Sequence, residues 1–206
     1  MAEQPISENE RWETRFRAPG YAFGKEPNGF LKSQAPRLPR SGSALSVADG
    51  EGRNGVWLAE QGLDVTAIDF SPTGVEKARA LAAERGVKLR TELADVMAWQ
   101  WPSDAYDVIA GIFIQFVTPA ERERLFANIK RALKSGGLLI LQGYRPEQLK
   151  YRTGGPQNVE QLYTRALLQS AFGDMTALEI REHDSAISEG SSHAGMSALI
   201  DLVAKK

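Results

Sequence analysis

Short apolar runs alternate with amphipathic stretches along most of the chain. The apolar runs are bounded by turn residues, which is typical of buried strands, and they lie at 44–48, 64–69, 87–93, 106–111 and 138–141. Between them, apolar residues recur at helical spacing and predict three helices: one near 53–61, one from Ser71-Pro72 to Gly86, and one from Pro119 to Lys134–Gly137. This alternation predicts an α/β fold whose parallel sheet carries helices on both faces and binds ligands beyond the carboxyl ends of its strands.

The C-terminal part departs from this alternation. A predicted helix near 159–171 is followed by two predicted strands, 177–184 and 197–204, with the polar stretch Ser188–Gly195 between them. Two strands joined in this way form a hairpin, so we expect the last strand to be antiparallel.

The first forty residues also differ from the rest. They predict a helix at Ser7–Arg17, a loop at 18–29 and a second short helix that ends before Pro36. We therefore expect one domain over 1–206, in which residues 1–40 form a lid and residues 41–206 form the core.

A glycine-rich turn follows the run at 44–48. Gly50, Gly52 and Gly55 have the spacing G-x-G-x-x-G, and Asp69 closes the next apolar run nineteen residues after Gly50. A strand, a glycine turn and a helix N-terminus let a ligand lie against bare backbone, and an acid at this position binds a ribose diol. The pattern predicts a cofactor of the adenosine type.

Two carboxylates, Asp49 and Glu51, lie in this turn. The pyrophosphate of a dinucleotide would come close to them, which is unfavourable in a partly dry site. S-adenosylmethionine (SAM) carries a sulfonium and an ammonium group instead, and both are attracted to carboxylates. The turn therefore favours SAM over NAD, with two solvated turn residues as the alternative interpretation.

Composition narrows the class of partner. The chain has 206 residues, 42% of them hydrophobic and 25% charged, and a formal net charge of −1. This charge predicts no nucleic-acid surface, and no apolar run approaches the roughly 20 residues that span a bilayer. The chain has no cysteine, which excludes disulfides, thiolate nucleophiles and cysteine-ligated metals. Without a signal-peptide pattern, we expect a cytoplasmic protein that holds no metal and is a monomer or weak homodimer.

These features together resemble the class I SAM-dependent methyltransferases. The glycine turn is similar to their first motif, Asp69 to their ribose-binding acid and Asp95 to the acid near adenine. The segment Leu133–Gly137, followed by Leu138–Leu141, is similar to the entry to their fifth strand. The resemblance implies a Rossmann-like sheet of seven strands in the order 3-2-1-4-5-7-6, with the seventh strand antiparallel.

Within this class, the segments 21–28, 50–54 and 146–156 are most similar to the tellurite-resistance and thiopurine methyltransferase-like group. That resemblance implies methyl transfer to a small soft nucleophile, namely a thiol, a thiopurine, or an oxyanion of selenium or tellurium. Three positions depart from the group: many relatives carry an acid, a glycine and a histidine where this chain has Ser46, Ala48 and Gln115.

The pattern and the resemblance together imply a set of site residues. Those expected to bind SAM lie in or just after the first four predicted strands: Asp49, Gly50, Glu51, Gly52, Asn54, Asp69, Phe70, Asp95, Val96, Ile112 and Phe113. Those expected near the methyl acceptor lie in the lid and beyond the fifth strand: Trp12, Tyr21, Phe23, Arg145 and His193. No catalytic residue is predicted, because a sulfonium is already activated and the protein needs only to align the reactants and exclude water.

Several of these residues also have a purely structural interpretation. Asp95 is equally a turn residue, and Ile112 and Phe113 are equally core residues. Arg53 lies in the first turn of a helix and needs a partner, which Asp49, Glu51 or a ligand carboxylate would provide. Two other functions stay open: a non-catalytic SAM-binding module and, less favoured, an NAD-dependent oxidoreductase.

Overall fold

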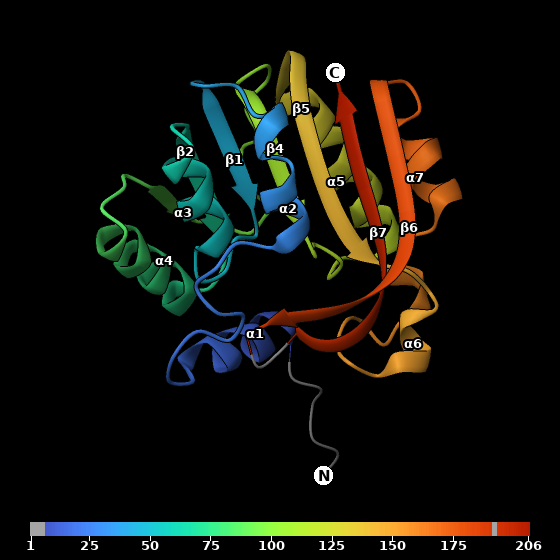
Figure 1. Cartoon of the computed structure of the whole chain (residues 1–206), viewed down its shortest axis with the longest axis horizontal. Coiled ribbons are helices and arrows are strands. Elements are labelled where there is room, and N and C mark those ends of the chain that lie inside the picture. The colour runs from blue at the N-terminus through green and yellow to red at the C-terminus, as the bar shows by residue number, and fades with distance from the viewer. Residues whose placement is uncertain (1–6, 191–192) are drawn as a thin grey trace.

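The computed structural model describes residues 7–190 and 193–206. Its centre is a seven-stranded sheet in the order β3-β2-β1-β4-β5-β7-β6 (Figure 1). The strands are β1 (Ser43–Val47), β2 (Asp64–Asp69), β3 (Arg90–Leu93), β4 (Tyr106–Ile112), β5 (Leu133–Tyr144), β6 (Thr176–Glu189) and β7 (His193–Lys205). The pairs from β3 to β5 are parallel, and β7 is antiparallel to both β5 and β6. The predicted Rossmann-like fold, its strand order and its antiparallel last strand are confirmed.

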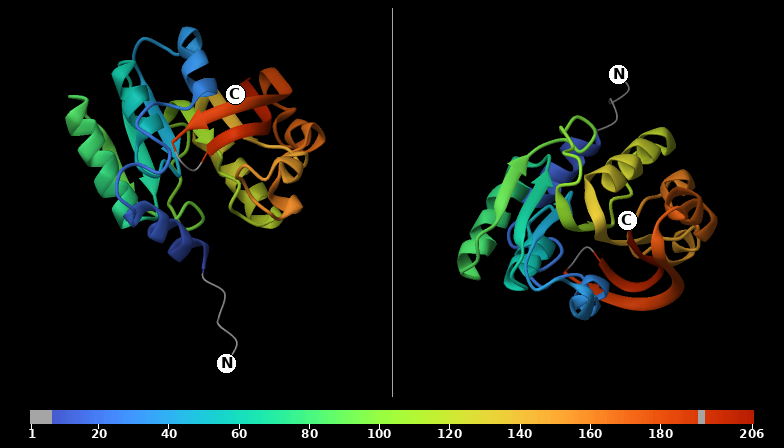
Figure 2. Two further views of the ribbon diagram at one scale, coloured as in Figure 1. Left: turned by 60° about the horizontal axis from the view of Figure 1, so that its bottom comes forward. Right: turned by 90° about the horizontal axis from the view of Figure 1, so that it is seen from above.

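Helices cover both faces of the sheet (Figure 2). They are α1 (Glu8–Arg17), α2 (Gly29–Ser33), α3 (Arg53–Glu60), α4 (Pro72–Glu84), α5 (Pro119–Ala132), α6 (Gln148–Tyr151) and α7 (Arg165–Phe172), with 3-10 turns at Ala35–Arg37 and Val159–Gln161. On one face, Phe126 of α5 and Phe172 of α7 belong to the cluster around Leu141, and on the other, Leu31 of α2 belongs to the cluster around Ile140. None of the helices in the described ranges is long and apolar enough to cross a membrane.

The helices begin where the local sequence predicts. The side chain of Ser71 accepts a hydrogen bond from the Gly74 N–H at 2.9 Å, and Pro72 follows at the first helical position, where no N–H is needed. Thr118 caps α5 in the same way, and Ser7 forms a capping box with Glu10 at the start of α1. The predicted starts at Ser7, Ser71 and Pro119 are confirmed.

Two predicted boundaries need correction. The strand expected at 87–93 begins only at Arg90, because the Val87 N–H donates to Ala82 O at 3.0 Å and completes the end of α4. The segment Lys134–Gly137 belongs to β5 and not to a cap, because the Gly136 N–H donates to Lys206 O at 2.7 Å.

The helix predicted near 159–171 is wrong as a single element. It is divided into the 3-10 turn Val159–Gln161 and α7. Between them, buried Tyr163 donates its N–H to Tyr144 O at the end of β5, at 2.9 Å, so the chain leaves helical geometry there. Thr164 then caps α7 through the Leu167 N–H.

The C-terminal hairpin is confirmed, but its strands are longer than predicted. The stretch expected to be a loop, Ser188–Gly195, contains the end of β6 and the start of β7, with Glu189 paired to His193. Ser185, Ile187 and Glu189 are partly buried and alternate with exposed neighbours, so this polar stretch keeps the period of a strand. The long hairpin extends past the sheet toward α1 (Figure 1).

Helix α1 lies across the carboxyl ends of the parallel strands (Figure 1). Its Glu13 accepts hydrogen bonds from the hydroxyl groups of Ser71 and Thr73 at the start of α4. Lys77 of α4 donates to Ala18 O at 2.9 Å and to Gly20 O at 2.6 Å, and so holds the segment that follows α1. These contacts place the N-terminal segment as a cover over the ligand edge of the sheet; its treatment as part of a single domain stays a prediction.

Candidate functional site

The glycine turn joins β1 to α3 at this edge. Gly50 and Gly52 have φ angles of +58° and +92°, which glycine adopts without strain. A Cβ atom on Gly52 would lie 2.6 Å from Ala78 of α4, so Gly52 is needed for packing. A Cβ atom on Gly50 would lie 2.9 Å from the ring of Phe16 in α1. The lid and the turn therefore meet directly over Gly50.

Asp69 ends β2 beside this turn. Its carboxylate accepts hydrogen bonds from the backbone N–H groups of Gly50 at 2.8 Å and Ser71 at 2.9 Å. Burial raises the pKa of Asp69 to about 6, although both hydrogen bonds favour the ionised form. The two donors fix the orientation of the carboxylate and leave acceptor capacity for further donors, such as the hydroxyl groups of a ribose.

Asp49 forms a buried pair with Ser46 beneath the turn. Ser46 Oγ donates to Asp49 Oδ1 at 2.6 Å, and the Gly55 N–H donates to Asp49 Oδ2 at 3.1 Å. Burial raises the pKa of Asp49 to about 7. An acid in place of Ser46 would lie within hydrogen-bond distance of the Asp49 carboxylate and repel it. The serine at position 46 is therefore compatible with the acid at position 49.

Ala48, the second departure, has a φ angle of +49°. That region favours glycine, because a Cβ atom is strained there. Replacing Ala48 by glycine should raise the free energy of unfolding by about 1 kcal/mol, since relief of strain exceeds the extra entropy of the unfolded chain. Urea unfolding measures the change. Ala44→Gly, at a buried strand position, should destabilise the protein instead, and a loss of stability in Ala48→Gly would contradict the argument.

Glu51 has partners within the protein, and its role in cofactor binding stays a prediction. Its carboxylate is buried against the lid, where it pairs with Lys77 at 2.8 Å and accepts the Ala22 N–H at 2.7 Å. Lys77 neutralises this carboxylate, so it does not supply the negative charge that favoured SAM over NAD. That part of the electrostatic interpretation is wrong, and the charge at the turn comes from Asp49 and Asp69.

Arg53 also has a different partner from those expected. Its guanidinium group pairs with Glu189 at the end of β6 at 2.6 Å, and both side chains are buried. The Glu189 carboxylate accepts further hydrogen bonds from Asn28 Nδ2 at 2.9 Å and the Gly29 N–H at 3.1 Å. Asn28 in turn donates its N–H to Asn54 Oδ1 at 3.0 Å. The hairpin, the lid and the start of α3 are therefore joined by one polar network.

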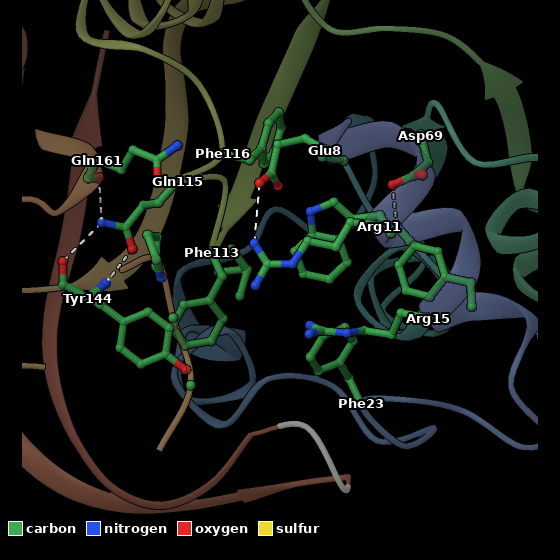
Figure 3. A pocket seen from close by; sticks show the side chains of 18 of the residues that line it. Glu8, Arg11, Arg15, Phe23, Asp69, Phe113, Gln115, Phe116, Tyr144 and Gln161 are labelled. Carbon is green, nitrogen blue, oxygen red and sulfur yellow. Dashed lines mark hydrogen bonds and ion pairs between the residues drawn. The ribbon is translucent and has the colours of Figure 1, made fainter. Parts of the chain in front are cut away.

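These elements enclose a cavity of about 350 Å³ at the carboxyl ends of the strands (Figure 3). Its walls come from α1, the glycine turn, the residues after β4 and the segment after α6. Nine predicted site residues line it: Trp12, Phe23, Asp49, Gly50, Asn54, Asp69, Phe70, Ile112 and Phe113. Its volume is in the range of small-molecule and cofactor sites. Within the described ranges, no cluster of three or more histidine, aspartate or glutamate side chains could hold a metal ion.

Four other predicted residues lie in or near the glycine turn and the third strand but do not line this cavity. Glu51 and Gly52 face the lid and α4, as described above. Asp95 is exposed and accepts the Met97 N–H at 2.8 Å, and it lines a separate shallow depression with Glu92 and Trp99. Val96 is buried in the core. The adenine role of Asp95 and Val96 stays a prediction.

Two residues predicted near the acceptor, Tyr21 and Arg145, are also absent from the cavity wall. Tyr21 donates its hydroxyl group to Lys77 O at 3.2 Å. Arg145 pairs with Glu147 and Asp184. His193 begins β7, and its side chain lies outside the described part of the structure. Of the lid residues, Trp12 and Phe23 are therefore the predicted pair that faces the cavity.

The structure adds lining residues that the sequence interpretation missed, among them Arg11, Arg15, Phe116 and Arg152. Arg11, Trp12 and Arg15 share one face of α1, and this spacing was the available signal. Phe113 has a φ angle of +58°, and its ring stacks on Tyr144 at 4.6 Å. Gln115, the third departure, donates Nε2 to Tyr144 O at 2.9 Å and to Gln161 O at 3.0 Å, so it holds the far wall together.

Comparison with known proteins agrees with this fold. Residues 44–137 match a family model described as a methyltransferase domain. The chain is 32% identical over 104 residues to a demethylmenaquinone methyltransferase of Thermus thermophilus, across 50% of this chain and 47% of the relative. It is 31% identical over 137 residues to a glycine/sarcosine N-methyltransferase of Parasynechococcus marenigrum, across 63% of this chain and 44% of the relative. A solved SAM-dependent methyltransferase of Methanosarcina mazei superposes with a TM-score of 0.64 at 17% identity, covering 87% of this chain and 98% of that one.

The fold is that of the class I methyltransferases, and residues 44–137 match a methyltransferase-domain model. These findings support a SAM-dependent methyltransferase with SAM as its cofactor. The chain spans about half the length of the curated relatives that it matches. The similarity to the tellurite-resistance and thiopurine group stays a prediction.

Proposed function

We propose that the chain transfers a methyl group from SAM to a small-molecule nucleophile. The observation that carries the proposal is the cavity that joins the Asp69 carboxylate, the glycine turn at Gly50 and an aromatic lid at the carboxyl ends of the strands. The names of both curated relatives, a demethylmenaquinone and a glycine/sarcosine methyltransferase, point to small acceptors and support the same class here.

The residues of the cavity fit the cofactor chemically. When bound, SAM supplies a methyl group that its sulfonium already activates. Asp69 would accept hydrogen bonds from the ribose hydroxyls, and the glycine turn at Gly50 lines the cavity beside it. Asp49 and Asp69 favour the positive charges of the ligand. Trp12 and Phe23, with ring centroids 6.0 Å apart, form an aromatic wall that excludes water.

The cavity also limits the kind of acceptor. Within the described ranges, no histidine or lysine lines it, and burial raises the pKa of Tyr144 far above neutral pH. The wall opposite Asp69, which is formed by Phe113, Gln115 and Tyr144, thus holds no group suited to remove a proton at neutral pH. An acceptor that ionises readily without a base suits this wall. We therefore propose a soft nucleophile, namely a thiol, a thiopurine, or an oxyanion of selenium or tellurium.

Calorimetric titration with SAM, S-adenosylhomocysteine and NADH tests the cofactor, and transfer of a labelled methyl group to thiols, selenite and tellurite tests the acceptor. Micromolar SAM binding with no NADH binding, and label in one of these acceptors, is the expected result. SAM binding without transfer to any acceptor would favour a non-catalytic SAM-binding module. NADH binding without SAM binding would exclude the proposed reaction.

The raised pKa values predict a pH dependence. A cationic ligand and its ribose hydroxyls bind the ionised forms of Asp49 and Asp69, whose pKa values are about 7 and about 6. SAM affinity should therefore be highest above pH 7. Below pH 7 it should fall by up to about tenfold per pH unit for each proton that the two carboxylates take up. Calorimetry in two buffers of different ionisation enthalpy should detect proton release near pH 6.5 on binding. An affinity that does not change between about pH 8 and about pH 5.5 would contradict this coupling.

A further inference from the structure

The apolar strand β5 carries a buried amide near its carboxyl end. Leu138 and Ile140 belong to the apolar cluster that contains Leu31 of α2, and Gln142 follows them on the same face of the strand. Gln142 is 2% exposed and does not line the cavity. Burying such a group is costly unless its donors and acceptors are all used. The partners of Gln142 therefore indicate its role.

Gln142 is hydrogen-bonded on both sides, in fixed directions. Asp201 lies opposite it on β7, and its carboxylate accepts Gln142 Nε2 at 2.6 Å. An ionised carboxylate only accepts, so it turns the amide nitrogen of Gln142 toward β7 and the amide oxygen toward the lid. There Gln142 Oε1 accepts Asn28 Nδ2 at 2.7 Å, which leaves Asn28 Oδ1 to accept the Leu31 N–H at 3.0 Å. Asp201 thus determines the orientation of both amides.

His183 of β6 holds Asp201 from the other side. His183 Nε2 lies 2.9 Å from Asp201 Oδ2, and His183 Nδ1 lies 2.7 Å from Ser185 Oγ. Since the carboxylate accepts, a neutral imidazole carries its proton on Nε2 and accepts the Ser185 hydroxyl at Nδ1. Asn28, Gln142, Asp201 and His183 therefore form one amide relay, whose hydrogen bonds all converge on Asp201.

The relay reaches the cavity through Asn28. The backbone N–H of Asn28 donates to Asn54 Oδ1 at 3.0 Å. Asn54 is buried near the start of α3 and lines the cavity. Because its oxygen faces the lid, the nitrogen of the Asn54 amide is turned away from the lid. Any loss of order at Asn28 would allow this amide to rotate.

We propose that Gln142 is a positioning residue, which fixes the orientation of Asn54 through Asn28 and is itself fixed by Asp201 and His183. The inference rests on the proposed function, because ligand affinity is one of its readouts. Gln142, Asp201 and His183 do not line the cavity, so the relay acts without touching the ligand. It orders the cavity wall before the ligand binds, and this lowers the entropic cost of binding.

Exchanging an acid and an amide tests the direction of the hydrogen bonds. Gln142→Glu should weaken binding of S-adenosylhomocysteine about tenfold, because two carboxylates would then face each other. Asp201→Asn should weaken it about threefold or less, since the new amide can accept from Gln142 and donate to His183 in its other tautomer. The double variant Gln142→Glu, Asp201→Asn again places a donor opposite an acceptor and should bind within about threefold of the wild type. Calorimetry gives the affinities.

Gln142→Met removes both hydrogen bonds without introducing a charge, so it tests the proposal even where Gln142→Glu does not fold. It should weaken binding about tenfold in the wild type but less than about twofold in an Asn54→Ala background, where the positioned group is absent. A purely structural role for Gln142 would give equal losses in the two backgrounds, and that result would overturn the proposal.

Amide hydrogen exchange of residues 28–34, measured without ligand, tests the relay independently of any methyl transfer. The N–H groups of Leu31 and Lys32 donate to Asn28 Oδ1 and Asn28 O. Their exchange should be about tenfold faster in Gln142→Met and in Gln142→Glu, and should return to the wild-type rate in the double variant. Gln169→Glu is the control, because it makes the same chemical change at an exposed position of α7.

Wild-type affinity in both Gln142→Glu and Gln142→Met would overturn the proposal, and so would a double variant that binds as weakly as Gln142→Glu. If the wild type binds no adenosyl ligand, the proposed function fails and hydrogen exchange alone decides. Unchanged exchange in Gln142→Met would then refute the relay, whereas faster exchange that the double variant reverses would support it.

Discussion

Replacing Asp69 by asparagine should weaken SAM binding about ten- to hundredfold and lower the stability of the protein as well. The carboxylate accepts from the backbone N–H groups of Gly50 and Ser71 at once. Asparagine offers one oxygen, so its amide N–H₂ would face one of these buried donors. An N–H left without an acceptor costs about 1–3 kcal/mol. Calorimetry gives the affinity, and urea unfolding gives the stability.

Asp64→Asn is the matched control for this variant. Asp64 begins the strand that Asp69 ends, and its side chain is 72% exposed. We expect neither its SAM affinity nor its unfolding free energy to change measurably. A variant Asp69→Asn that binds SAM as tightly as the wild type would remove Asp69 from the cofactor site.

The second large effect is expected from Glu189→Ala, which should lower the free energy of unfolding by about 3–5 kcal/mol. The substitution leaves the buried guanidinium group of Arg53 without its counter-ion. It also removes one of the two acceptors of Asn28 Nδ2 and the acceptor of the Gly29 N–H. Because these groups join the hairpin to the lid, SAM binding should weaken in the same variant. Urea unfolding and calorimetry measure the two effects.

An exposed ion pair made by another glutamate of β6 provides the comparison with the buried Glu189 pair. Glu179 pairs with Arg37, and their side chains are 59% and 43% exposed. Glu179→Ala should therefore cost less than about 1 kcal/mol. The double variant Arg53→Met, Glu189→Ala removes both buried charges and should recover much of the stability that Glu189→Ala loses. Equal losses in Glu179→Ala and Glu189→Ala would show that burial of the Arg53 pair has no energetic importance.

The parts of the site that could be predicted are those with a local signal. Asp69 and Gly50 lie on one strand end and one turn, and the parallel sheet brings these two places together without further information. The strand order was implied by the resemblance rather than by periodicity. Ser71, Pro72 and Pro119 marked helix starts because a cap or a first-turn proline acts within its own turn of the helix.

The parts that were missed depend on contacts between distant segments. Arg53 and Glu189 are 136 residues apart, and no local pattern pairs them. Glu51 carries the charge that suits a cationic ligand, but Lys77 and Ala22 reach it first from α4 and the lid. The face of α1 that carries Arg15 was visible as a helical spacing, whereas the cavity beneath that face appears only when the lid is folded onto the sheet.

The position of β7 has a consequence for how the chain folds. β7 is the last strand in chain order, yet it lies between β5 and β6 and is the only sheet partner of β6 within the described residues. Until β7 inserts, β5 presents an open edge with the apolar run Leu138–Leu141, and β6 has no partner in the sheet. Such pairing between distant segments is slow, and an open apolar edge is prone to pair with another chain. We therefore expect aggregation of the newly made protein to begin at the open edge of β5. Faster insertion of β7 beside β5 should then raise the soluble yield.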